Sequence, residues 1–476
     1  MQHRSCPICS GKRTVYAFSH EDYRICRCEN CTFLFVNPQP PDEVLAGVYN
    51  ETYFIGSKPG ESVIAQEVKR ATARHYLRLM ELYAGAPLGG RVLEIGCGRG
   101  EFILEAVEHG LAAVGVEYAE ASASQARRLL QGRAEILTGE IASAGLAEAS
   151  FDCCVFADVI EHVRDPAAFI DEVWRVLKPG GLVFIATPSM DSPSARLMQE
   201  NWMEFKLEHL SYFNPHTLDQ LLHRHFFSDV QTGAGYKVLT LDYIRSHFRR
   251  YPVGGLLSPV PWLLGLLPDS VRRRPRFFRS SGIIGCARRG ERRRTRRLSI
   301  IVPVYNEAAS AGELLGGLEA KTVEGVEKEI IVVESNSTDG SREIVQGYAG
   351  RPGWTIILQD RPQGKGFAVR AGLARATGDY VLIQDADLEY DLDDYDILLE
   401  PLLSGRESFV LGARHGKRAW WKMRRFNDRP ASALLLNFGH YLFATAINVM
   451  FGLRLHDPFT MYKVFRRDCI HHLEFQ

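Results

Sequence analysis

The chain has 476 residues, which is more than one hydrophobic core can organise and predicts two or three domains. Its formal net charge is zero, so the chain as a whole lacks the basic excess of a nucleic-acid-binding protein, and nucleic acid is not expected as a partner. The sequence contains neither a run of about 20 apolar residues that could span a membrane nor the apolar N-terminal stretch of a secretion signal. We therefore expect a cytoplasmic protein.

Cysteines are concentrated at the N-terminus, where four of them form two pairs with two residues between the partners: Cys6, Cys9, Cys28 and Cys31. In a reducing compartment such clusters bind metal more often than they form disulfides. Four thiolates around one zinc ion make a closed, structural site. Residues 1–45 are therefore predicted to be a small zinc-binding module, with a metal-free module as the alternative. The spacing leaves open whether Cys26 or Cys28 is the third ligand.

Residues 46–288 are predicted to form an α/β domain. A helix-like amphipathic stretch is followed, from Arg91 onward, by alternating strand-like and helix-like runs, as in doubly wound folds. The expected strands are residues 91–96, 112–117, 134–139, 151–158, 181–188 and 281–288.

Glycines follow the first of these strands at positions 96, 98 and 100, where they allow a ligand to lie close to the backbone. Glu117 ends the next strand, 21 residues after Gly96, at the spacing of a carboxylate that binds ribose hydroxyls. Glu94 lies beside the loop and would repel a pyrophosphate. It suits a cationic ligand such as S-adenosylmethionine, which has a sulfonium, an ammonium and no phosphate. A dinucleotide-binding domain is the alternative.

Five segments of this domain resemble those of class I S-adenosylmethionine-dependent methyltransferases and occur in the family's order. They are "VLEIGCGRG", "GVEYAE", "LTGEIAS", "FDCCVFADVIEHVRDP" and "VLKPGGLVFIATPS". The resemblance implies a Rossmann-like fold in which nine residues surround the cofactor: Glu94, Gly96, Gly98 and Gly100 at the methionine part, Glu117 at the ribose, Tyr118, Glu140 and Ile141 at the adenine, and Asp158 near the methyl group. The family more often has aspartate where this chain has Glu140.

The motif "EHLSYF" supplies the candidate acceptor-side residue, His209. Histidine titrates near neutral pH, so His209 is predicted to be a general base, with a hydrogen-bonded structural histidine as the alternative. Together with the cysteine module, this motif resembles the sugar C-methyltransferase branch, in which this histidine lies near the acceptor. The resemblance implies a sugar or sugar-like methyl acceptor and leaves open whether carbon or oxygen is methylated.

Two segments before the second domain have an apolar or basic character. Residues 254–268 are apolar but too short to span a bilayer, and they are predicted to lie on an anionic membrane or to form a lid or core helix. Residues 289–297 are predicted to be a basic linker, which either is a solvated tether or contacts anionic lipid.

Residues 298–476 begin a second α/β alternation whose strands end in polar residues. Lys365 lies between glycines at a helix N-terminus, which suits a diphosphate. Asp385 and Asp387 end a strand with their side chains on the same side, where they suit Mg²⁺ or Mn²⁺ bridging a diphosphate.

These motifs, in this order, resemble the inverting GT-A glycosyltransferases that include dolichol-phosphate mannosyltransferase. The resemblance implies that five residues shape the pocket of a nucleotide-diphospho-sugar donor: Pro303, Tyr305, Glu307, Glu334 and Asp339. The family commonly reads "DDGSTDG" where this chain reads "ESNSTDG", which leaves the donor nucleotide open. A lipid-phosphate acceptor needs no strong base, whereas a saccharide hydroxyl would need Asp457 or Glu389. In relatives, this domain continues with further strands. The glycosyltransferase domain is therefore expected to be truncated at its C-terminus.

The sequence thus predicts a bifunctional enzyme that methylates a sugar-like acceptor and transfers a hexose to a lipid phosphate or saccharide. Its expected role is cell-surface glycan biosynthesis at the inner face of the membrane. The alternative is that only one domain is catalytic and the other is a binding or targeting module.

Overall fold

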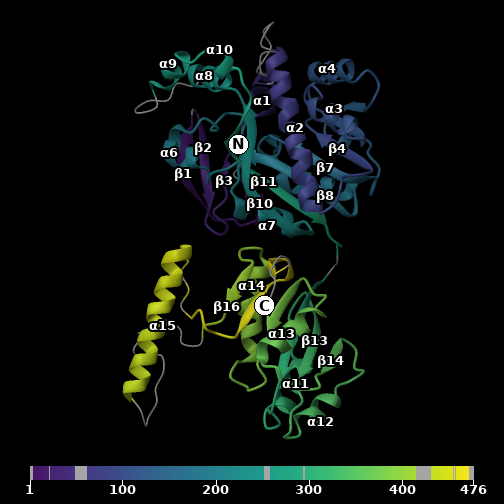
Figure 1. Cartoon of the computed structure of the whole chain (residues 1–476), viewed down its shortest axis with the longest axis vertical. Helices are drawn as coiled ribbons and strands as arrows, with labels where there is room; N and C mark the ends of the chain where they lie inside the picture. The colour runs from purple at the N-terminus through teal and green to yellow at the C-terminus, as the bar shows by residue number, and fades with distance from the viewer. Residues whose placement is uncertain are drawn as a thin grey trace. The chain divides into compact units, whose positions relative to one another are not determined.

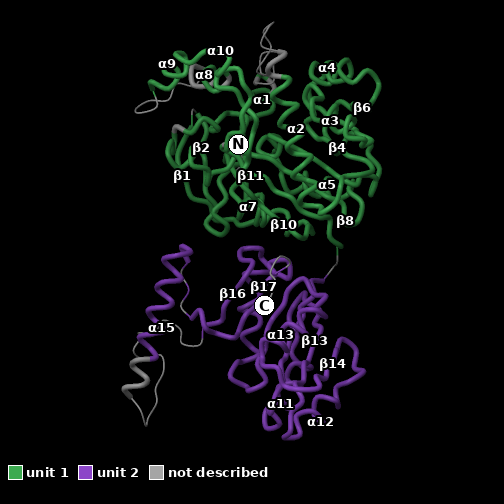
Figure 2. Tube along the Cα trace, viewed as in Figure 1, with its two compact units in different colours: residues 1–292 green, residues 293–476 purple. Residues whose placement is uncertain are grey.

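The chain folds into two compact units, residues 1–292 and 293–476 (Figures 1 and 2). The computed structural model describes residues 4–20, 22–48, 62–250, 258–292, 295–413, 430–453, 455 and 457–470. Parts of three segments considered above lie outside the described residues: residues 254–257 of the apolar stretch, residues 293–294 of the basic linker and the last six residues. The first unit contains two sheets and the second contains one, and the hydrophobic clusters of each unit are its own.

The cysteine-rich segment forms a small antiparallel sheet of β1 (Thr14–His20), β2 (Tyr23–Cys28) and β3 (Leu34–Val36). A fourth strand, β9 (Ser211–Tyr212), comes from the "EHLSYF" motif and pairs with β3. The backbone N–H of Val36 also donates to the carbonyl of Leu210 at 3.0 Å. The N-terminal module is therefore built into the larger domain and holds the segment that carries His209.

The large sheet of the first unit has the order β10-β11-β8-β7-β4-β5-β6. Its parallel part consists of β4 (Arg91–Ile95), β5 (Ala112–Glu117), β6 (Glu135–Thr138), β7 (Phe151–Ala157) and β8 (Leu177–Pro188). Two antiparallel strands extend it, β10 (Phe227–Leu239) and β11 (Arg276–Arg289). The parallel strands other than the edge strand β6 are buried on both faces, as their continuous apolar runs require.

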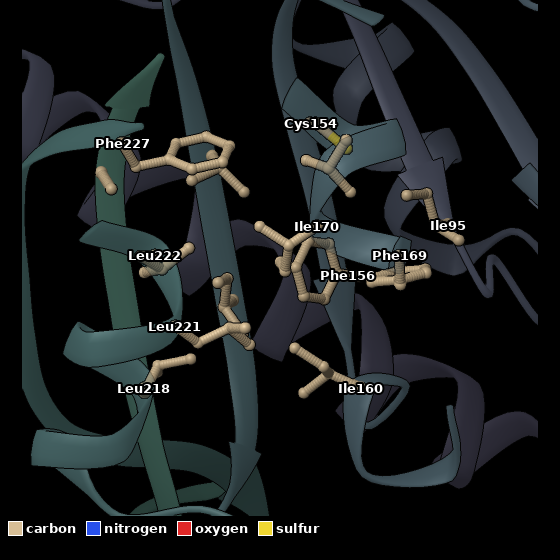
Figure 3. Packing of buried hydrophobic residues seen from close by; sticks show 14 of the residues in the cluster. Ile95, Cys154, Phe156, Ile160, Phe169, Ile170, Leu218, Leu221, Leu222 and Phe227 are labelled. Carbon is tan, nitrogen blue, oxygen red and sulfur yellow. The ribbon is translucent and has the colours of Figure 1, made fainter. Parts of the chain in front are cut away.

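Helices cover both faces of this sheet. On one face, α5 (Pro166–Val176) and α7 (Pro215–Arg224) contribute Ile170 and Leu221 to a core that also contains Phe156 of β7 (Figure 3). On the other face, α2 (Ser62–Ala84), α3 (Glu101–Glu108) and α4 (Glu120–Leu130) build a second core. The first unit is therefore a helix–sheet–helix sandwich of the Rossmann-like type.

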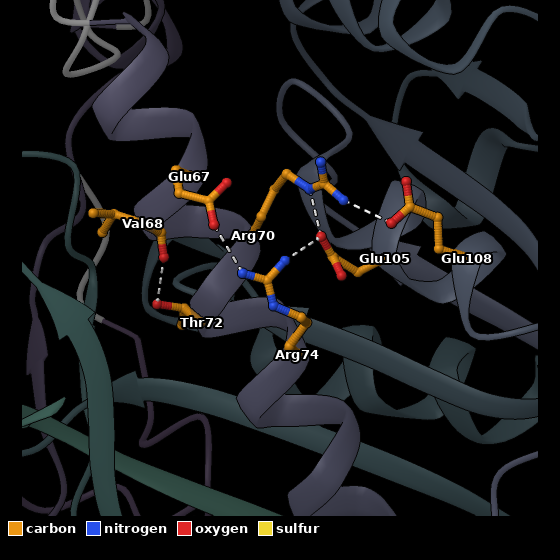
Figure 4. A network of polar contacts seen from close by, with 7 residues as sticks. All are labelled: Glu67, Val68, Arg70, Thr72, Arg74, Glu105 and Glu108. Carbon is orange, nitrogen blue, oxygen red and sulfur yellow. Dashed lines mark hydrogen bonds and ion pairs between the residues drawn. The ribbon is translucent and has the colours of Figure 1, made fainter. Parts of the chain in front are cut away.

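A network of ion pairs fastens α2 to α3 (Figure 4). Glu105 of α3 is 5% exposed and contacts the guanidinium groups of both Arg70 and Arg74 of α2. Arg70 also binds Glu108 at 2.6 Å, and Arg74 binds Glu67 at 3.0 Å. A buried carboxylate with two cationic partners strongly resists separation of the helices. Because α3 begins directly after the glycine loop, these ion pairs also fix the position of the helix from which the loop extends.

Two arginines of the predicted basic linker, residues 289–297, are held by side chains of the first unit. The guanidinium of Arg289, the last residue of β11, lies 3.7 Å from the centroid of the Trp174 ring. Arg292 forms an ion pair with Asp171 at 2.7 Å. These two arginines therefore stabilise the packing of α5.

The sheet of the second unit has the order β14-β13-β12-β15-β17-β16. Its parallel strands are β12 (Arg296–Val304), β13 (Val326–Glu334), β14 (Trp354–Leu358) and β15 (Tyr380–Ile383). The antiparallel strands are β16 (Phe409–Leu411) and β17 (Lys463–Arg466). The helices are α11 (Ala311–Ala320), α12 (Ser341–Gln346), α13 (Lys365–Leu373), α14 (Tyr395–Leu403) and α15 (Pro430–Phe451).

Candidate functional site

The four predicted zinc ligands lie together. The sulfur atoms of Cys6, Cys9, Cys28 and Cys31 all lie within 4.8 Å of one another, and the pairs Cys6–Cys31 and Cys9–Cys28 are 3.4 and 3.5 Å apart. Zinc–sulfur bonds of about 2.3 Å in a tetrahedron place sulfurs about 3.8 Å apart, so the group fits zinc. The thiol of Cys26 points elsewhere and donates to the carbonyl of Asn37 at 3.6 Å. The geometry favours Cys28 over Cys26 as the third ligand.

Metal analysis of two serine variants tests this site. We expect the purified protein to contain one zinc per chain, Cys28→Ser to lose it, and Cys26→Ser to retain it, because only Cys28 has its sulfur in the cluster. Atomic emission spectrometry of the gel-filtered proteins measures the zinc content. A folded wild-type protein without zinc, or zinc lost equally from both variants, would contradict the assignment.

The glycine loop and Glu117 face each other at the carboxyl ends of β4 and β5. The backbone N–H of Gly98 donates to one oxygen of Glu117 at 2.8 Å, and that of Ala119 donates to the other at 2.9 Å. Gly96 has a φ of 71°, and a Cβ there would lie 2.4 Å from a methyl group of Val159, so only glycine fits. The carboxylate is thereby held at the loop, where a ribose would lie.

Glu94 provides a second negative charge beside the loop. It is 8% exposed, and its Oε2 atom has no hydrogen-bond partner among the described residues. Burial raises the pKa of Glu94 well above its ordinary value, and the nearby charges of Glu101 and Glu117 raise it further. A cationic ligand would satisfy the unpaired oxygen and offset the mutual repulsion of these acids. The donor set therefore fits the ammonium and sulfonium of S-adenosylmethionine.

The predicted adenine-side residues have different exposures. Tyr118 follows β5 and is 65% exposed, and Glu140 is exposed at the start of the turn η1 (Ile141–Ser143). The side chain of Ile141 is buried in the core that α5 covers. Tyr118 and Glu140 are therefore accessible to a ligand, whereas Ile141 offers chiefly its backbone.

Asp158 follows β7 with a φ of 55° and binds the ammonium of Lys237, from β10, at 2.5 Å. Burial alone would raise the pKa of Asp158, but the charge of Lys237 outweighs it and holds the pKa below its ordinary value. Lys237 belongs to no motif, and sequence reasoning missed it. The position of Lys237 depends on the pairing of β10 with β11 at the edge of the sheet.

His209 lies against two residues of the turn that follows β7, η2 (Ile160–His162). The rings of His162 and His209 have centroids 4.7 Å apart, and Glu161 lies within the same group. Burial lowers the pKa of His162 to about 4 and that of His209 well below its ordinary value, so both rings are neutral. The "EHV" and "EHLSYF" motifs, 47 residues apart at His162 and His209, therefore form one cluster.

In the second unit, the ends of β12 and β13 are joined through their loops. The backbone N–H of Glu307 donates to the Ser341 hydroxyl at 2.8 Å, and that of Ala308 donates to Asp339 at 3.0 Å. Glu334 is fully buried, where it accepts from the N–H of Ser337 at 2.6 Å. The predicted donor-pocket residues Pro303, Tyr305, Glu307, Glu334 and Asp339 are therefore brought to one edge of the sheet.

The two aspartates that end β15 differ in exposure. Asp385 is 9% exposed and forms a close ion pair with Lys365 at the start of α13. Asp387 is exposed, and its side chain accepts from the N–H of Glu389 at 3.1 Å. The predicted diphosphate-binding lysine thus contacts one of the two predicted metal ligands, Asp385, and Asp387 follows two residues later.

Of the two candidate bases for a hydroxyl acceptor, Asp457 is buried and Glu389 is exposed. Asp457 lies 3.8 Å from the imidazole of His440, which belongs to α15. Glu389 lies two residues after Asp387 and is therefore nearer in sequence to the predicted metal site.

Two family models match the chain. Residues 65–232 match the model described as a methyltransferase domain, and residues 299–473 match the model described as glycosyl transferase family 2. The predicted resemblances to a methyltransferase and to a glycosyltransferase, and the α/β fold class with a Rossmann-like and a GT-A domain, are confirmed.

Individual relatives match one domain each. The undecaprenyl-phosphate 4-deoxy-4-formamido-L-arabinose transferase of Pseudomonas aeruginosa is 32% identical over 176 residues, which are 36% of this chain and 48% of that protein. A probable S-adenosylmethionine-dependent methyltransferase of Mycolicibacterium smegmatis is 37% identical over 114 residues, 24% of this chain and 42% of that protein. The YcgJ protein of Bacillus subtilis, a solved structure, has 18% identity and a TM-score of 0.35, and the match covers 46% of this chain and 99% of that one. The chain spans about half the length of the curated relatives it matches.

Proposed function

We propose that this chain, which carries a methyltransferase domain and a family 2 glycosyltransferase domain, is a bifunctional enzyme of cell-surface glycan biosynthesis. It methylates a sugar-like acceptor and transfers a hexose from a nucleotide-diphospho-sugar to a lipid phosphate or a saccharide. One observation carries the proposal: each unit gathers, at the carboxyl ends of its parallel strands, the charges that its own cofactor requires. These are Glu94 and Glu117 for a cation, and Lys365 with Asp385 for a diphosphate and its metal.

In the first unit, the residues at the strand ends bind and orient the methyl donor. Glu94 would pair with its ammonium group, and Glu117 would accept from its ribose hydroxyls, since both carboxylates lie at the glycine loop. Asp158, held by Lys237, lies after β7 on the side of the Glu161–His209 cluster. Bound in this way, the sulfonium methyl group would face an acceptor that lies against the cluster, and its transfer would become effectively unimolecular.

In the second unit, Asp385 and Asp387 would hold a Mg²⁺ or Mn²⁺ ion. This ion would neutralise the negative charge on the departing nucleotide diphosphate. Lys365 contacts Asp385 and would turn to the diphosphate once the ion is bound. Lipid phosphate is the favoured acceptor, because it is already anionic and because the Pseudomonas relative is named for transfer to undecaprenyl phosphate.

The surface of α15 supports peripheral contact with a membrane. Four apolar side chains in its C-terminal half are more than 60% exposed: Phe443, Val449, Met450 and Phe451. Apolar side chains are exposed on α9 (Val260–Gly265) of the first unit as well, among them Trp262. Among the described residues, none of the helices has the length and apolar character to cross a bilayer. We infer that α15 lies in the membrane interface at the inner face, beside a lipid acceptor.

A product assay on the intact protein tests the proposal. The protein is supplied with S-adenosylmethionine, a panel of UDP- and GDP-sugars with Mn²⁺, and either a saccharide or a lipid phosphate in anionic or neutral vesicles. Mass spectrometry is expected to find a hexosyl lipid phosphate and a methylated sugar, and the protein is expected to float preferentially with anionic vesicles. The absence of both products would overturn the function, and equal flotation would overturn the electrostatic part of the membrane contact.

A further inference from the structure

A cluster of possible metal ligands lies in the first unit, apart from the four cysteines. Glu161 and His162 belong to η2, and His209 precedes β9; one ligand atom from each lies within 4.8 Å of the others. Glu161 is 1% exposed and His209 is 3% exposed. Three segments fix the group, because the backbone N–H of Leu210 donates to the carbonyl of Glu161 at 2.7 Å and β9 is paired with β3.

Two buried polar atoms of this cluster have no hydrogen-bond partner among the described residues. They are Oε1 of Glu161 and Nδ1 of His209. Buried polar atoms are nearly always paired, so two orphans in one cluster indicate a missing common partner. Glu161 and His209 are near enough to share such a partner, yet they do not bond to each other.

Two further polar atoms of the cluster have partners that orient them. The Thr187 hydroxyl donates to Oε2 of Glu161 at 2.9 Å. Nδ1 of His162 lies 3.2 Å from the carbonyl of Glu208, which directs Nε2 of the same ring away from that contact. Histidines that bind metal commonly hold their second nitrogen on a carbonyl in this way, and carboxylate ligands are hydrogen-bonded in turn.

We propose that Glu161, His162 and His209 hold a divalent transition-metal cation. Two imidazoles and one carboxylate are a ligand set for ions such as Zn²⁺, Fe²⁺, Mn²⁺ or Co²⁺. Three protein ligands leave coordination positions open, unlike the closed set of four cysteines. The cluster follows β7, next to Asp158, where the proposed methyl transfer takes place.

The open positions give the cation a role that rests on the proposed methyltransferase function. An acceptor with a hydroxyl or carbonyl oxygen, as a sugar has, can bind to the cation through that oxygen. A bound hydroxyl would lose its proton to solvent water more readily, and the resulting oxygen would take the methyl group as the S–CH3 bond breaks and the neutral thioether leaves. In this role His209 would be a ligand of the cation and would not accept the proton itself. Asp158 remains with Lys237 and is not needed as a ligand.

Cobalt binding to the full chain tests the site. The protein carries Asp387→Asn, which removes a predicted ligand of the glycosyltransferase metal ion. It is loaded with one equivalent of zinc to occupy the four cysteines and is then titrated with Co²⁺. Weak visible absorption bands without intense sulfur-to-cobalt bands identify nitrogen and oxygen ligands. The same titration is made with Glu161→Gln, which keeps an acceptor for Thr187, and with His209→Ala. The matched control is His216→Ala, which removes an exposed imidazole of the same segment.

We expect one Co²⁺ per chain with the nitrogen–oxygen spectrum, binding that is weakened at least about tenfold in both ligand variants, and unchanged binding in the control. The absence of that spectrum from the parent protein, or equal affinity in all variants with native circular dichroism, would overturn the site. S-Adenosylmethionine binding is measured by calorimetry in the same samples. If the protein binds S-adenosylmethionine but does not bind Co²⁺, only the cation site is overturned. If it binds Co²⁺ but does not bind S-adenosylmethionine, the proposed methyltransferase function is overturned.

Discussion

Replacing Asp387 by alanine is expected to abolish sugar transfer and to leave methyl transfer unchanged. The exposed carboxylate of Asp387 lies two residues after Asp385, and the pair would hold the ion that neutralises the leaving diphosphate. Charge stabilisation of this kind is worth several kcal/mol, so turnover should fall by about a thousandfold or more. Initial rates of hexose transfer at saturating donor and Mn²⁺, with methyl transfer assayed in parallel, measure both effects.

A neighbouring acid provides the matched control for this variant. Asp393 is also exposed and lies in the same region, but its carboxylate binds Lys321 at 3.1 Å. Asp393→Asn should therefore retain sugar transfer, because an exposed ion pair contributes little. Sugar transfer retained by Asp387→Ala, or lost equally in both variants, would remove Asp387 from the metal site.

The residues at the carboxyl ends of the parallel strands could be located from the sequence. The runs that carry these residues are buried and apolar and are followed closely by glycine or an acid, so Glu94, Glu117 and Asp385 are identifiable as residues at or just after strand ends. In parallel sheets, these ends meet at one edge, and ligands bind there. Local patterns and this general rule are therefore sufficient to predict both candidate cofactor sites.

The acceptor side of the first unit could not be built from the sequence. It depends on contacts between distant segments: Leu34 pairs with Tyr212, and Lys237 reaches Asp158 from an added strand. No local periodicity encodes such pairings. The choice between Cys26 and Cys28 was undetermined for a related reason. They are two residues apart in β2 and share a face by alternation, so only the folded turn decides which sulfur joins the cluster.

Replacing His209 by alanine is expected to reduce methyl-transfer turnover by about 10²–10⁴-fold, the usual effect of removing a group that acts on the reacting proton. The affinity for S-adenosylmethionine should change by less than about twofold, because His209 lies in the cluster after β7, whereas the predicted partners of the ammonium and ribose, Glu94 and Glu117, lie on β4 and β5. Single-turnover kinetics give the rate, and isothermal titration calorimetry gives the affinity. The expected loss is the same whether His209 accepts a proton or holds a cation that binds the acceptor.

Glu117→Gln should show the opposite pattern, and the contrast makes the His209 result decisive. The carboxylate of Glu117 is held by the N–H groups of Gly98 and Ala119, and glutamine can accept only one of those bonds while offering no charge to the ribose side. Affinity for S-adenosylmethionine should therefore fall, while turnover at saturation falls less than in His209→Ala. Equal losses of affinity in the two variants would mean that His209 supports the cofactor loop and not the acceptor, and the acceptor would then have to lie elsewhere on the unit.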